Sequence, residues 1–130
     1  GRKQKIQTNG FDEFHPLIDA VAAEFQHPAD WVPTYMVHSD HWPFVAKGVP
    51  GIIIKAESDY DGRGFSHTTA DTLEKVDIRD LRTHAILAAS LIEKISRMDV
   101  DPKTQNDIED DLLDRGRAED LQLSGDWPYS

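Results

Sequence analysis

The feature that most constrains the fold is a short, uninterrupted apolar run at residues 51–54, Gly-Ile-Ile-Ile. With its flanks it predicts a strand over 49–56, because the run is β-branched and too short for a helix. The lack of alternation is typical of a strand that is buried on both faces in the middle of a mostly parallel sheet. Polar segments that place a histidine near an aspartate, Ser39–Phe44 and Ser66–Thr72, flank the run. An α/β enzyme builds its site from such loops at strand ends.

The remaining pattern predicts a layered α/β domain with helices on both faces of the sheet. Apolar residues at helical spacing predict a helix over 11–26 and a longer one that begins with Asp77 as its N-cap and ends near Arg97. Phenylalanines 11, 14, 25 and 44 are expected in the core with the isoleucines at 52–54. The other expected elements are strands at 3–8 and 35–37, a helical turn over 42–47 stopped by Gly48, a helix over 104–115, and a tail from 121 to 130 that packs through Leu121, Leu123 and Trp127 or not at all.

Composition narrows the class of protein. The chain has 130 residues and no cysteine, which fits one domain by length and leaves His, Asp and Glu as the only metal ligands. Its net charge of −10 argues against nucleic acid or an anionic membrane as the main partner. The acidity fits either an ordinary solvated surface or adaptation to salt.

The sequence gives no direct sign of where the protein resides. It shows no signal peptide and no apolar run near the length of about 20 residues that spans a membrane. It opens on Gly-Arg-Lys without a start methionine, so we expect a chain processed or excised from something longer.

The histidine segments allow two interpretations each. His67 is a suitable zinc ligand, and Asp71 could support it, but the same residues could merely form turn and cap structure before the long helix. Asp40 and His41 could orient a ligand or a water, although capping of the helical turn at Trp42 is the favoured role for Asp40. Catalytic zinc takes three protein ligands and a water, and no local histidine pair supplies them.

Taken together, three segments resemble one family. Ser39-Asp40-His41-Trp42-Pro43-Phe44, the run from Lys47 to Ile54, and His67-Thr68-Thr69-Ala70-Asp71-Thr72 are similar in order and spacing to the C-terminal half of the co-catalytic di-zinc aminopeptidases. That family also includes glutamate carboxypeptidase II, the transferrin receptor ectodomain and glutaminyl cyclase. The resemblance implies a three-layer αβα sandwich with a mixed, mainly parallel sheet. It divides the chain into a zinc exopeptidase portion, 1–97, and an acidic helical extension, 98–130.

The resemblance also implies site roles. His67 corresponds to the family's last metal ligand, and Ser39, Asp40, His41 and Asp71 to supporting positions. Ser66 occupies the position where relatives often carry a tyrosine that helps to stabilise the tetrahedral intermediate. The implied reaction is release of an N-terminal residue from a peptide substrate by a water that two zinc ions activate.

The family's other ligands and its general base precede the Ser-Asp-His motif, so this chain is expected to be inactive and to bind zinc weakly alone. Its expected partners are the N-terminal part of the same domain or a second copy. Two alternatives stay open, a non-catalytic binding module on the same scaffold and a glutaminyl cyclase-like acyltransferase.

Overall fold

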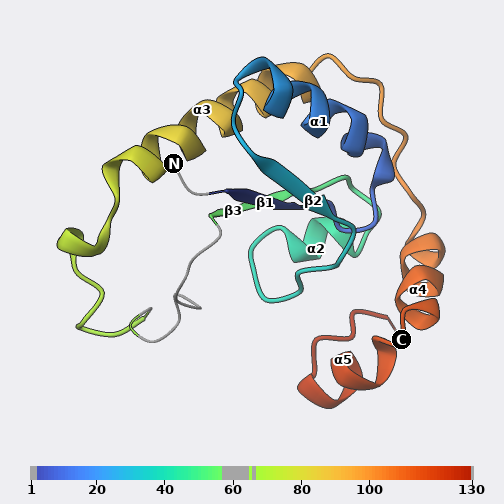
Figure 1. Ribbon diagram of the computed structural model, residues 1–130. Helices are drawn as coiled ribbons and strands as arrows, with labels where there is room; N and C mark the ends of the chain where they lie inside the picture. Colours follow the sequence, from blue (N-terminus) through green and yellow to red (C-terminus); the bar gives the residue numbers. More distant parts are fainter. Residues whose placement is uncertain (1–2, 57–64, 66, 130) are drawn as a thin grey trace. The chain divides into compact units, whose positions relative to one another are not determined.

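Figure 1 shows the computed structural model, which describes residues 3–56, 65 and 67–129. Close contacts divide the chain into two compact units, a first unit within 1–6, 15–31 and 54–98, and a second within 7–14, 32–53 and 99–130. The helices and strands of the described part are β1 (Gln4–Gln7), α1 (His15–Glu24, after a 3-10 turn at Asp12–Phe14), β2 (Ala29–Val32), α2 (Trp42–Val45), β3 (Ile53–Ala56), α3 (Ile78–Ile95, after a 3-10 turn at Leu73–Lys75), α4 (Gln105–Asp114) and α5 (Ala118–Ser124). None of the helices in these ranges is long and apolar enough to cross a membrane.

The strands form one mixed sheet in the order β2-β1-β3. Backbone amides of Gln4 and Thr8 donate to the carbonyls of Pro28 and Val32, each at 3.0 Å, so β1 and β2 run in parallel with α1 as their crossover. The strand β3 is antiparallel to β1. The predicted α/β class and mixed sheet are confirmed, whereas a complete three-layer sandwich remains a prediction.

Two strand predictions need correction. The second strand lies at 29–32, and residues 35–37 are not in a strand, although Tyr35 and Val37 are buried. The reason is that the Met36 amide donates to the side chain of Asn9 at 2.9 Å rather than to a neighbouring strand. The strand β3 begins only at Ile53 and comes last in the described sheet, and residues 51–55 are only half-buried. Burial of this strand on both faces in mid-sheet was therefore a wrong expectation.

In the first unit, α1 and α3 pack side by side (Figure 1). Their buried residues are Ile18 and Val21 of α1 and Leu87 and Leu91 of α3. The apolar residues at helical spacing that predict this long helix also include Ile78, Leu81 and Ile92. All three are more than half exposed, at 54%, 53% and 69%. The helix therefore has two apolar faces, of which α1 covers one.

The start of α3 gives a first prediction. Asp77 is the N-cap, and its carboxylate accepts from the amides of Arg79 at 2.8 Å and Asp80 at 3.3 Å, as its sequence position suggested. Replacing Asp77 with alanine should lower the free energy of unfolding by about 1 kcal/mol, because those amides lose their partner at a helix end. Asp77→Ser should keep most of the stability. Urea unfolding of both variants tests this, and equal losses would contradict a capping role.

The second unit contains α2, α4 and α5 and its own core. Phe11 and Phe14 are buried there as expected, with Val45, Ile108, Leu112 and Leu121. Phe44 is 62% exposed, because the single turn of α2 buries Trp42 and Val45 instead. In the first unit Phe25, just after the end of α1, is 44% exposed, so both phenylalanines were wrongly expected in the core.

The C-terminal segment is more ordered than a tail. Thr104 and Asp107 form a capping box at the start of α4, which agrees with the predicted helix. Residues 118–124 form α5, of which Leu121 is buried while Leu123 is 81% exposed. Leu121 therefore packs as expected, and Leu123 does not.

Candidate functional site

The Ser39–His41 segment leads directly into α2. The Trp42 amide donates to the Ser39 carbonyl at 2.9 Å, and the Val45 amide donates to the His41 carbonyl at 3.1 Å. His41 is the N-cap residue, and no side chain caps the helix, so the expected capping by Asp40 is not found. Ser39 and Asp40 are exposed, and His41 is half-buried. The backbone of this segment, rather than a cap, sets the start of α2.

Asn9 holds both ends of the segment that carries this motif. Its side-chain oxygen accepts from the Met36 amide at 2.9 Å, and its side-chain nitrogen donates to the Gly51 carbonyl at 2.9 Å. The side chain is fully buried, and the backbone is left-handed, with φ 50°. Residues 36–51, called here the motif segment, are thus closed into a loop by one buried amide.

Sequence reasoning missed this role. In the sequence, Asn9-Gly10 is a turn signal, and both residues do have positive φ. The available clue was chemical, since asparagine tolerates left-handed backbone and can donate and accept at the same time. Which distant backbone groups it would meet depends on the tertiary fold.

The loop with His67 belongs to the first unit. His67 is exposed, and its φ of 62° lies in the left-handed region. The turn around it is held by Thr68, whose hydroxyl donates to the Phe65 carbonyl at 2.6 Å and accepts from the Ala70 amide at 3.2 Å. Lys75 donates to the Ala70 carbonyl, and its ammonium lies 4.1 Å from the centre of the Phe65 ring. Local bonds therefore maintain this loop.

The described residues do not by themselves fit a zinc site. Within 3–56, 65 and 67–129, no group of three or more His, Asp or Glu residues is placed to hold a metal ion. His67 and Asp71 belong to the first unit, and Ser39, Asp40 and His41 to the second. Ser66 lies outside the described residues. The structure thus describes each motif within its own unit, with its own local support.

Comparison with known proteins decides the family. The model of peptidase family M28 matches residues 3–92, which is more than half of the chain. The chain belongs to peptidase family M28. No curated protein and no solved structure matches it. The M28 match includes both the Ser39–Phe44 and His67–Thr72 motifs and ends within α3, so residues 93–130 follow it. M28 peptidases are generally zinc-dependent.

Proposed function

We propose that this chain is part of a zinc-dependent aminopeptidase and contributes His67 as one metal ligand. The observation that carries the proposal is the M28 match, which contains the Ser39–Phe44 and His67–Thr72 motifs in family order. His67 suits the role because it is exposed on a locally held loop and histidine nitrogen is a good zinc ligand. Its left-handed backbone is a conformation often found at functional sites.

We further propose that the other ligands and the general base come from a part of the protein that precedes Gly1. One histidine falls short of the three protein ligands that catalytic zinc requires. Among the described residues, no group of three or more possible ligands forms around it. In this proposal the site is supported by Ser39, Asp40, His41 and Asp71. Ser66 occupies the position at which relatives often carry a tyrosine, so this chain supplies no phenol there. The isolated chain is then inactive.

The exposed face of α3 supports a partner of this kind. Ile78, Leu81 and Ile92 present apolar side chains on one long helix, and such surfaces commonly mark places where protein packs. The preceding part of the same domain is the proposed occupant, and self-association of the isolated chain is the alternative. The substrate is a peptide with a free N-terminus.

The test uses zinc binding and turnover. The chain alone should hydrolyse no aminoacyl-p-nitroanilide and bind zinc far more weakly than a site with three protein ligands. A longer chain that includes the preceding part of the domain should bind zinc and hydrolyse the substrate. His67→Ala in that longer chain should lower zinc affinity about 10- to 100-fold or more, because a direct ligand matters at least as much as its supporting groups. His27→Ala, outside both motifs, serves as the matched control.

The outcomes separate the alternatives. Metal-dependent turnover by the 130-residue chain would overturn the need for a preceding part. A longer chain that folds but binds no zinc would indicate the non-catalytic module. Zinc binding with cyclisation of N-terminal glutamine and no hydrolysis would indicate the acyltransferase.

A further inference from the structure

The segment that follows the M28 match contacts the motif segment directly. The Lys103 amide donates to the Gly48 carbonyl at 2.9 Å, and the Tyr129 hydroxyl donates to the Ala46 carbonyl at 3.0 Å. Asp126 pairs with His38 at 3.4 Å, immediately before Ser39-Asp40-His41. Residues 99–129, called here the strap, therefore contact the motif segment before and after α2.

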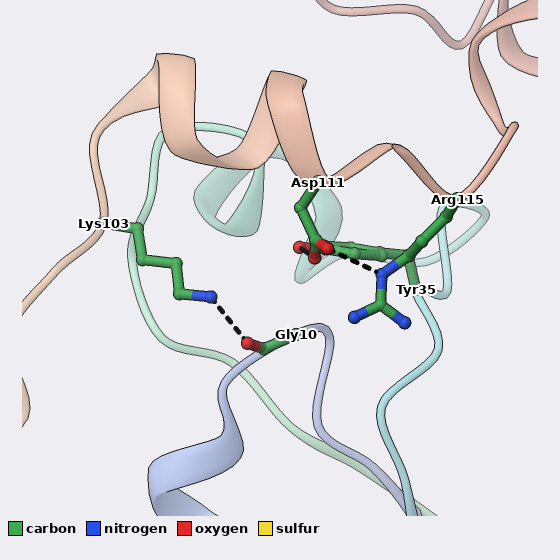
Figure 2. Close-up of polar contacts among 5 residues, drawn as sticks. All are labelled: Gly10, Tyr35, Lys103, Asp111 and Arg115. Carbon is green, nitrogen blue, oxygen red and sulfur yellow. Dashed lines mark hydrogen bonds and ion pairs between the residues drawn. The ribbon is translucent and has the colours of Figure 1, made fainter. Parts of the chain in front are cut away.

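A polar cluster joins the strap to the turn beside Asn9 (Figure 2). The Lys103 ammonium donates to the Gly10 carbonyl at 2.6 Å and lies 5.1 Å from the centre of the Phe11 ring. Asp111 accepts from the Tyr35 hydroxyl at 2.6 Å and from Arg115 Nε at 2.9 Å. Two basic residues and one acidic residue of the strap thus bracket Gly10 and Tyr35.

The charges in this cluster are mutually supporting. Partial burial raises the pKa of Asp111, but the hydrogen bonds from Tyr35 and Arg115 outweigh it, so this pKa lies below its usual value. Burial, followed by the hydrogen bond to Asp111, raises the pKa of Tyr35. At neutral pH a carboxylate therefore accepts from a neutral phenol, which is a strong charge-assisted bond.

A short path of contacts leads from Asp111 to the start of the motif segment. Asp111 fixes the hydroxyl of Tyr35, and Tyr35 packs edge-on against Trp42 of α2, with ring centres 6.3 Å apart. The next residue, Met36, has its amide bonded to Asn9. Gly10, which follows Asn9, is held by Lys103. The strap thus acts on the same turn and the same side chains that close the motif segment.

We infer that the strap positions the motif segment, with Asp111 and Lys103 as its positioning residues. In this inference the strap contributes no side chain to the proposed chemistry. Its effect on catalysis rests on the proposed function, because the placement of Ser39–His41 affects turnover only if the protein is an enzyme. The positioning is nevertheless a property of this chain and can be measured without zinc or substrate.

The experiment is amide hydrogen exchange of the full chain. Asp111→Ala should raise exchange of the Met36 amide by about tenfold through easier local opening. The Ala46 and Gly48 amides, in the turn after α2, should exchange faster by a similar factor. Amides of Leu87 and Leu91 in α3 should keep their rates. Asp111→Asn, which retains an acceptor for Tyr35, should show a smaller increase. Asp114→Ala, an exposed acidic residue in the same helix, is the matched control.

Lys103→Met supplies a second variant, because it keeps an unbranched side chain but removes the ammonium that donates to Gly10 and lies over the Phe11 ring. It should also raise exchange at Met36, by a smaller factor. Unchanged exchange over 36–51 in both variants would overturn the inference. So would an equal rise in α3, which would mean general loss of stability rather than positioning. Neither result would argue against the proposed zinc chemistry. Conversely, a longer chain without turnover would not argue against the positioning of the motif segment by the strap.

Discussion

Replacing Gly48 with alanine is expected to lower the free energy of unfolding by about 2 to 5 kcal/mol. Gly48 lies in the turn that follows α2 and has φ 82°, a conformation that disfavours any side chain with a Cβ atom. An added Cβ would also lie 1.7 Å from the carbonyl oxygen of Lys103. That oxygen belongs to the backbone, so only movement of the strap away from the α2 exit could relieve the overlap.

A matched control separates the two causes. Gly116 also has positive φ, 67°, but an added Cβ would meet no atom within 4 Å. Gly116→Ala should therefore lose only the backbone contribution, about 1 to 2 kcal/mol. Urea unfolding of both variants gives the difference, which measures how tightly the strap is packed at Gly48. Equal losses would mean that the strap is not packed tightly there.

The parts of the fold that the sequence could predict are those set by local interactions. The start of α3 follows from the carboxylate of Asp77 and two amides within three residues, and the left-handed turn after α2 follows from Gly48. The helix after Thr104 begins with a capping box, which likewise involves only near neighbours. Such signals are complete within a few residues, so the tertiary fold does not change their meaning.

The sequence predictions were wrong where contacts between distant parts of the chain determine the local structure. Residues 35–37 have the apolar character of a strand, but a buried asparagine at position 9 takes the Met36 amide. Helix α3 has two apolar faces, and only the position of α1 determines that Leu87 and Leu91 are the buried ones. In the candidate site the motifs were visible in the sequence. The supports from Asn9 and the strap were not, because they join residues 27 to 93 positions apart.

Replacing Asn9 with alanine is expected to destabilise the chain by about 3 to 5 kcal/mol, combining two lost buried hydrogen bonds with a poorer left-handed residue. The Met36 amide and the Gly51 carbonyl would both lose their bond to this fully buried side chain. The two ends of the motif segment would then no longer be joined. Urea unfolding measures the total, and exchange of the Met36 amide reports the local part.

Two further substitutions separate the contributions to the loss of stability in Asn9→Ala. Asn9→Gly removes the same hydrogen bonds but suits a φ of 50°, so it should be about 1 kcal/mol more stable than Asn9→Ala. Asn9→Asp keeps an acceptor for Met36, but an ionised carboxylate cannot donate to Gly51, so Met36 should stay protected while stability falls. If Asn9→Asp exposed the Met36 amide as fully as Asn9→Ala, the two ends would depend on one another, and the bond to Gly51 would be the one that sets the loop.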